Sequence, residues 1–129
     1  MIGKAIFARL GAVSAVTALI ASRVYPFPAP ADGARPYVTY QMIGNPRERA
    51  LDGVTGLARA RMQLNCWAVT PVEAESLAEA VRQALEGYAG TAGGVTVKHA
   101  RSEDEGDLFD EAVDLTGKRL DFIFEYLDT

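Results

Sequence analysis

The most regular hydrophobic pattern of the chain lies in residues 51–88, which predict a turn, a strand and a helix in close succession. Over residues 58–68, small and apolar side chains alternate with polar or aromatic ones. Successive residues of a strand point to opposite faces of a sheet, so one face of this strand is predicted to contact a core. The other face carries two arginines, two amides and an indole: Arg59, Arg61, Gln63, Asn65 and Trp67. A face that only contacts solvent does not need this combination of side chains.

A helix is predicted to begin directly after this strand. Thr70 and Glu73 match a capping box, in which the hydroxyl and the carboxylate each bind a backbone N–H that the first helical turn leaves free, and Pro71 takes the first helical position. Apolar residues then recur at steps of three and four: Ala74, Leu77, Ala78, Val81, Ala84, Leu85 and Tyr88. This stripe is predicted to pack on the apolar face of the preceding strand.

A further strand is predicted over residues 37–43, where Val38, Tyr40 and Met42 fall on one face. Between it and the strand at 58–68, Asp52–Gly53 is a strong turn signal, so the two strands are predicted to form a long hairpin. The hairpin carries Arg47, Glu48, Arg49 and Asp52. Two interpretations remain open: an interaction arm that stands beyond the core, or a surface loop without a binding role.

The C-terminal third predicts two more strands. Residues 95–100 follow a glycine-rich break, and residues 119–127 show the clearest alternation of the chain. Between them, the acidic run 102–107 is predicted to be a solvated loop or a strand crossing, residues 108–115 are ambiguous, and Thr116–Gly117 is predicted to be a turn. The acidic run lacks the alternating ligand positions of a calcium loop, so no metal site is expected there.

The N-terminal residues admit two interpretations. Lys4 and Arg9 precede a short apolar run, as in a secretory signal, and cleavage after Ala21 would leave an exported small α+β binding domain. The run is too short to span a bilayer. Its apolar residues also fit helical stripes broken near Gly11, which predicts a helix of the mature domain instead. The proline-rich residues 26–36 predict a surface loop.

Together these elements predict an α+β fold: a mainly antiparallel sheet of four to five strands, helices packed on one face, and a long protruding β-hairpin. A length of 129 residues and a hydrophobic content of 49% suit a single domain, residues 1–129, with a substantial core. The net charge of −4 argues against a protein that binds nucleic acid by neutralising phosphates.

Few residues suggest catalysis. Cys66 is the single cysteine and falls on the apolar strand face, which predicts a buried thiol. His99 is the single histidine and has no serine or cysteine near it in sequence, so a hydrolase built on either residue stays an alternative without a substrate. No catalytic residue, cofactor or metal is expected. Arg59 and Arg61, with Trp67, favour a protein interface, because interfaces are enriched in arginine and tryptophan.

The order of these segments resembles a known family, the tail completion proteins of tailed bacteriophages, which include tail terminators and tail-to-head joining proteins and are also found in gene transfer agents. The resemblance rests on residues 21–26 (ASRVYP), 35–40 (RPYVTY), the hairpin that begins at 51–53, residues 58–67 (ARARMQLNCW), 73–80, 85–87, and a closing strand that begins at 119–122. Each segment is common by itself, whereas their order over nearly the whole chain is not. In this family the N-terminal segment is a helix of the mature protein.

The resemblance implies a structural virion protein without enzyme activity. Such proteins form a ring, typically a hexamer, that caps the head-proximal end of the tail tube and joins it to the head connector. The implied partners are copies of the same chain, the tail tube protein and the head–tail connector or stopper protein, while DNA passes through the ring without specific binding. The implied location is the tail of a phage or phage-like particle, assembled in the bacterial cytoplasm, with no membrane partner. The expected subunit or tube interface comprises Arg47, Glu48, Arg49, Asp52, Arg59, Arg61 and Gln63.

Overall fold

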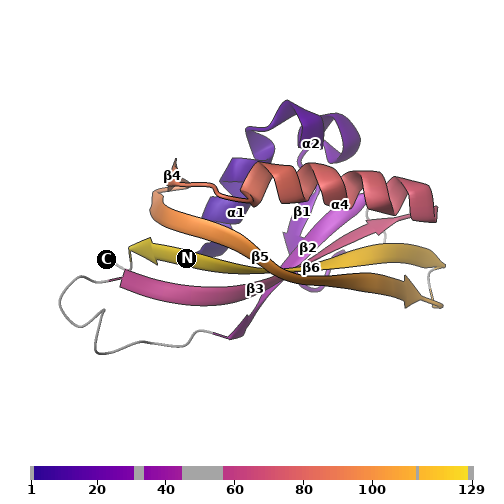
Figure 1. The fold of residues 1–129 in the computed structure, drawn as a ribbon. Coiled ribbons are helices and arrows are strands. Elements are labelled where there is room, and N and C mark those ends of the chain that lie inside the picture. Colours follow the sequence, from indigo (N-terminus) through magenta and orange to yellow (C-terminus); the bar gives the residue numbers. More distant parts are fainter. Residues whose placement is uncertain (1, 31–33, 45–56, 113, 128–129) are drawn as a thin grey trace.

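The computed structural model describes residues 2–30, 34–44, 57–112 and 114–127. In this part of the chain, α1 (Ile2–Gly11), α2 (Ser14–Ile20) and α4 (Pro71–Leu85) lie on one face of a six-stranded sheet (Figure 1). The strands are β1 (Val24–Pro26), β2 (Tyr37–Gly44), β3 (Leu57–Ala68), β4 (Gly90–Ala92), β5 (Val95–Asp110) and β6 (Leu115–Leu127). The predicted α+β class is confirmed.

The sheet differs in detail from the prediction. Its order is β1-β2-β3-β6-β5-β4, and β1 pairs with β2 in parallel while the other neighbours are antiparallel. The prediction of four to five strands was therefore too low, and the sheet is mixed. The two additional strands, β1 and β4, have three residues each. Segments of three residues are too short to show an alternation of polar and apolar side chains. They are strands because the adjacent strands, β2 and β5, form hydrogen bonds with them.

The second half of the chain forms two strands that are longer than predicted. The acidic run 102–107 belongs to β5, and Thr116–Gly117 lies inside β6, so both predictions of irregular structure were wrong. Bases on β6 stabilise the acidic strand from the side: Lys118 Nζ lies 2.7 Å from Asp107, and Arg119 Nη2 lies 3.4 Å from Asp104. Pairs of opposite charge across two strands stabilise the sheet. They therefore stabilise the strand conformation of an acidic segment whose own sequence does not favour it.

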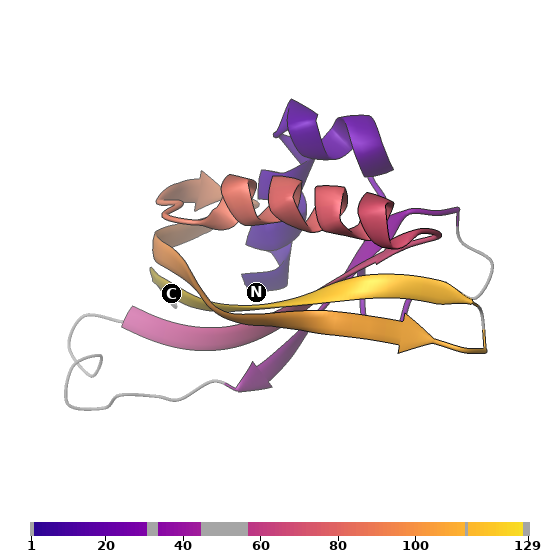
Figure 2. The same cartoon turned by 45° about the vertical axis from the view of Figure 1, so that its right-hand side comes forward.

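Helix α4 begins as predicted. The Thr70 hydroxyl accepts a hydrogen bond from the Glu73 N–H at 3.2 Å, and Pro71 lies in the first turn. The Glu73 carboxylate accepts the N–H of Val69 at 3.1 Å, one residue before the N–H that a standard capping box would supply. The predicted stripe is buried from Ala74 to Leu85, and it faces the sheet side that carries Leu64, Phe122 and Phe124 (Figure 2).

The N-terminal segment forms two helices that pack into the core. Six of their residues are buried: Ile2, Ala5, Ile6, Leu10, Val16 and Ile20. Arg9 ties α1 to the end of α4, because its Nε donates to the Ala84 carbonyl at 2.9 Å and its guanidinium lies 4.5 Å from the centre of the Tyr88 ring. Cleavage after Ala21 would remove these contacts, so the packing favours the mature-helix interpretation.

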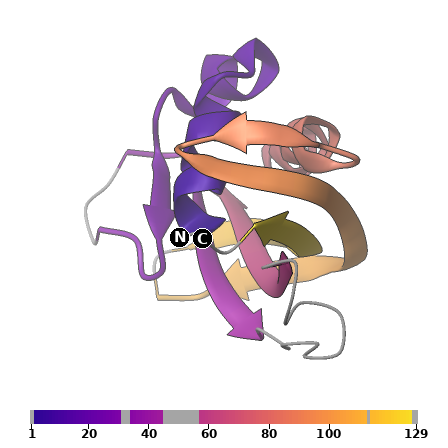
Figure 3. The ribbon, with the colours of Figure 1, turned by 90° about the vertical axis from the view of Figure 1, so that its left-hand side faces the viewer.

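Seen with the left side of Figure 1 toward the viewer, the sheet is strongly curled (Figure 3). Strand β4 lies against α1, and a side-chain carbon added to Gly93 would stand 2.5 Å from the Lys4 carbonyl oxygen. Within the described residues, no single helix is long and apolar enough to cross a membrane; α1 and α2 reach that length and composition as a pair, and they are bent by 89°. The predicted hairpin tip, residues 45–56, lies outside the described residues.

Candidate subunit interface

The face of the sheet opposite the helices holds the predicted polar residues. Strand β3 is central, and its register with β6 sets Arg59 opposite Glu125, Arg61 opposite Ile123 and Gln63 opposite Asp121. Directly paired residues of an antiparallel ladder share a face. Alternation along β3 therefore places three of the predicted interface residues on this face, as expected from the sequence. No described helix covers it, and we call it the uncovered face.

Most of the charges on this face are paired within the chain. Arg59 Nη2 lies 2.9 Å from Glu125 Oε2, and Arg119 Nη1 lies 2.7 Å from Asp121 Oδ2. The Gln63 amide donates to Asn65 at 3.1 Å. These contacts neutralise the face locally and hold its side chains in fixed positions, which lowers the entropy cost of presenting them to a partner.

Arg61 differs from its neighbours. It is half-buried in β3 between Gly44 of β2 and Ile123 of β6, and it makes no ion pair or hydrogen bond with any residue that the structure describes. A half-buried guanidinium presents up to five donors in a fixed plane. Its geometry suits a carboxylate or carbonyl acceptor.

Two buried polar atoms on the same face also have no hydrogen-bond partner within the described part of the chain. They are Oγ1 of Thr39, a residue 2% exposed, and Oδ1 of Asp121, a residue 6% exposed. Unsatisfied buried polar atoms cost free energy and are rare in folded proteins. A partner chain or ordered water on this face would satisfy them.

One end of the uncovered face is aromatic. The rings of Tyr25 and Tyr37 meet edge to face with centroids 6.0 Å apart, Trp67 lies next to Tyr37 in register, and the Trp67 ring covers Gly117 of β6. Burial raises the pKa of Tyr37 above its ordinary value, so its hydroxyl stays protonated and can donate a hydrogen bond. The sequence revealed Trp67 but not this cluster, because the register that joins β1, β2, β3 and β6 is not visible in the sequence.

The remaining predicted site residues, Arg47, Glu48, Arg49 and Asp52, lie in residues 45–56, outside the described part of the chain. Their role in an interface stays a prediction.

The two candidate catalytic residues lie apart from each other. Cys66 is buried on the core face, and burial raises the pKa of its thiol to about 12, so it stays protonated at neutral pH. His99 is exposed on β5 opposite Glu125. Cys66 pairs with Lys118, seven residues from Glu125 along β6, which is roughly 23 Å. The two side chains therefore do not form a nucleophile–base pair.

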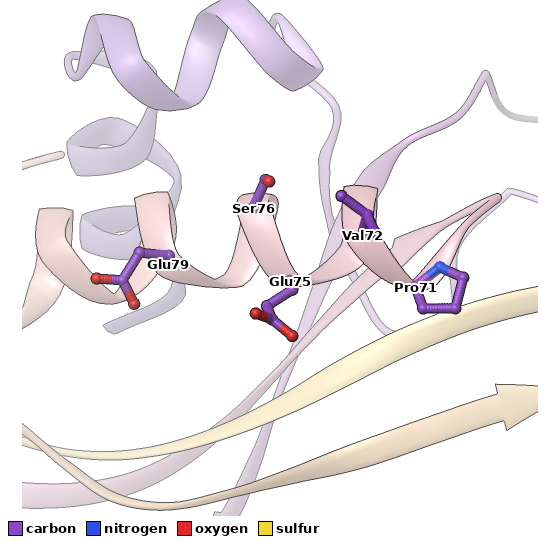
Figure 4. A pocket seen from close by; sticks show the side chains of 5 residues that line it. All are labelled: Pro71, Val72, Glu75, Ser76 and Glu79. Atoms are coloured by element: carbon purple, nitrogen blue, oxygen red, sulfur yellow. The ribbon is translucent and has the colours of Figure 1, made fainter.

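A surface hollow of about 570 Å³ lies along the solvent side of α4, lined by Pro71, Val72, Glu75, Ser76 and Glu79 (Figure 4). All five residues come from one helix, and Val72 is 77% exposed. Ligand sites are generally clefts in which several elements converge with polar groups. The described residues that line this hollow belong to α4 alone, so they do not converge from several elements.

The fold defines a class of protein: a small α+β domain in which helices cover one face of a curled, mixed sheet. A family model described as Tail completion protein gp17 matches residues 4–126, and the chain belongs to this family. It is thus a structural protein of bacteriophage-type tails. Its fold is similar to that of a chain in a solved structure titled "Virion of native gene transfer agent (GTA) particle", with a TM-score of 0.76 and 21% identity over 96% of this chain and 92% of that chain. No curated protein matches the sequence.

Proposed function

We propose that this protein is a tail terminator. Copies of the chain form a closed ring, a hexamer, on the last ring of tube subunits at the head-proximal end of the tail. The ring stops further tube growth, presents a docking surface to the head connector, and lets DNA pass without specific binding. The protein works by shape and contact, is assembled in the bacterial cytoplasm, and stays in the virion or gene transfer particle.

The observation that carries this proposal is the uncovered sheet face, considered together with family membership. Among the described residues, the face has buried polar atoms without a hydrogen-bond partner at Thr39 and Asp121, and the half-buried guanidinium of Arg61 has no ion-pair partner there. A ring of identical chains needs two unlike surfaces on each subunit, because its contacts are head to tail. The polar sheet face and the helix-covered face of this domain are unlike in that sense.

Reversing the charge of Arg61 tests the proposal. In the Arg61→Glu variant the new carboxylate repels the acceptor that the arginine binds on the neighbouring chain, and a like-charge contact in an interface costs several kcal/mol. We expect the variant to remain a folded monomer by circular dichroism while ring formation and attachment to purified tubes, measured by native mass spectrometry and electron microscopy, are lost.

Lys4→Glu is the matched control. It makes the same charge change at an exposed position on the helix-covered side of the sheet, and it should leave rings and tube attachment intact. Wild-type ring yield from Arg61→Glu would show that this part of the sheet face is solvated in the particle. A wild-type chain that stays monomeric and never attaches to tubes would overturn the proposed function itself.

A further inference from the structure

The uncovered face presents a cation and a hydrogen-bond acceptor that lack partners within the described part of the chain. Arg61 of β3 is half-buried and forms no ion pair with any described residue. Asp121 of β6 is 6% exposed; Arg119 binds its Oδ2, whereas its Oδ1 has no hydrogen-bond partner among the described residues. Asp121 is paired with Gln63, two residues from Arg61. One strand across and two residues along the sheet amount to about 8 Å between the two positions.

Helix α4 presents complementary groups on the opposite side of the sheet. Its outer surface carries Val72, Glu75, Ser76 and Glu79, which line the surface hollow of this helix (Figure 4). Glu79 is bound to Arg82. Glu75 and Ser76 are exposed; the carboxylate forms no ion pair and the hydroxyl no hydrogen bond with any residue that the structure describes. The outer surface of α4 therefore offers an anion next to a hydrogen-bond donor.

The spacing of these groups on the helix agrees with the spacing on the sheet. An α-helix has about 3.6 residues per turn, so consecutive side chains are about 100° apart around the axis. At a radius of about 5–6 Å, this angle separates them by roughly 8 Å. Figure 4 shows Glu75 directed toward the strands and Ser76 away from them. A sheet face laid on α4 can thus receive Glu75 at Arg61 and Ser76 at Asp121 together.

Glu75 suits this contact better than the acids of β5 do. Glu103, Asp104 and Asp107 are each bound to a base of the same chain. Glu75 lies in the hollow beside Val72, which is 77% exposed. A chain that binds the carboxylate therefore also removes apolar surface from water, which is favourable.

The two surfaces must belong to different copies of the chain. Arg61 lies on the uncovered face and α4 covers the other face, so the sheet separates Arg61 from Glu75 within one chain (Figure 2). A symmetric contact through either surface alone would bring like charges into the same interface, which is unfavourable. A contact of the sheet face with α4 is head to tail, and head-to-tail contacts are those that close a ring.

We propose that the outer surface of α4 in one subunit packs on the uncovered face of the next subunit, with Glu75 bound to Arg61 and the Ser76 hydroxyl donating to Oδ1 of Asp121. This inference rests on the proposed ring and names the two surfaces that join its subunits. The second subunit supplies the wall that the hollow of α4 lacks among the described residues of its own chain.

A charge swap tests the pair. Arg61→Glu places two carboxylates in the contact and Glu75→Arg places two guanidinium groups there, so each should raise the protein concentration needed for half-assembly roughly a hundred-fold. The double variant restores opposite charges and should assemble near the wild-type concentration. Analytical ultracentrifugation measures half-assembly, and circular dichroism of each variant checks that the subunit is folded.

Glu111→Arg is the matched control, because it reverses an exposed acid that lies outside α4. By itself it should leave the half-assembly concentration unchanged. Combined with Arg61→Glu, it should give no recovery, since the added base is not in the proposed contact.

Chemical cross-linking gives an independent readout that leaves Arg61 and Glu75 intact. Gln63 lies opposite Asp121 in the β3–β6 ladder, so a short bismaleimide should join Gln63→Cys of one copy to Ser76→Cys of another. The native Cys66 is buried and does not react. The mixture should give linked dimers and each variant alone none. Gln63→Cys mixed with Lys4→Cys, an exposed position on α1, should stay unlinked.

Normal rings from Glu75→Arg, rings without the cross-link, or no recovery in the charge swap would each overturn this inference and leave the proposed function standing. Loss of tube attachment by Glu75→Arg while rings stay intact would assign α4 to the tube protein, and would also overturn it. A wild-type chain that forms neither rings nor cross-links would overturn both.

Discussion

At the scale of single residues, the contact between Trp67 and Gly117 shows how a missing side chain positions a large one. A side-chain carbon at residue 117 would lie 2.8 Å from the Trp67 ring and 3.0 Å from the Cys66 carbonyl oxygen. Non-bonded carbon atoms approach to about 3.5–4.0 Å, so a residue with a side chain does not fit here without movement. Gly117 therefore leaves the space that the Trp67 ring occupies, at the end of the sheet where Tyr25 and Tyr37 meet.

We predict that Gly117→Ala displaces Trp67 and lowers the free energy of unfolding by about 1–3 kcal/mol, the usual cost of overpacking. Urea denaturation followed by the fluorescence of this single tryptophan measures both effects at once. Gly44→Ala is the matched control in a strand, because a carbon added there would meet Arg61 at 3.7 Å, an ordinary contact. Equal stability of the two variants would show that the indole has room to move.

At the scale of elements, the N-terminal helices form part of the core although their sequence resembles a secretory signal. The helix pair closes the side of the core next to β4 and the C-terminal end of α4, and Arg9 fixes it there. These helices contribute six buried residues, and their loss is expected to destabilise the fold, since hydrophobic burial is the main favourable term in folding.

Neighbouring residues of α1 provide a test. Ile6 is fully buried and Phe7 is 47% exposed. We predict that Ile6→Ala lowers the free energy of unfolding by about 2–5 kcal/mol, the range for truncating a buried aliphatic residue, while Phe7→Ala changes it by less than about 0.5 kcal/mol. Thermal and urea denaturation of both variants would show this difference. If neither substitution had any effect, α1 would not be part of the folded domain, as expected for a cleaved signal.

At the scale of the whole molecule, the protein is acidic, and part of its acidic charge lies on β5, where Glu103, Asp104 and Asp107 are paired with bases. The net charge is −4, and β5 carries five acids between residues 103 and 110. The uncovered face neutralises most of its own charges through pairs such as Arg59–Glu125 and Arg119–Asp121. A protein that surrounds DNA with such a surface repels phosphates instead of binding them.

We predict no binding of double-stranded DNA in a mobility-shift assay at about 0.1 M salt with up to ~10 µM protein, because non-specific binding depends on neutralised phosphates. The same assay on the variant with Glu75→Lys and Glu105→Lys provides the comparison. Each substitution raises the net charge by two, so the net charge of the variant is zero instead of −4. Salt-dependent retardation by the wild-type protein would contradict the idea of an acidic conduit.

The sequence by itself determined the elements whose patterns are local. Alternation in β3, the stripe and cap of α4, and the helical N-terminal stripe depend on residues a few positions apart, so they are visible without a structure. The same alternation correctly placed Arg59, Arg61 and Gln63 on one face.

The tertiary structure decided what depends on pairing between distant segments. β1 and β4 exist because β2 and β5 pair with them, and the acidic run is a strand because Lys118 and Arg119 of β6 lie beside it. The register also decided which arginines are paired with an acid, and it brought the residues of the aromatic cluster together. None of these features has a local signal, because each depends on residues brought together by the sheet.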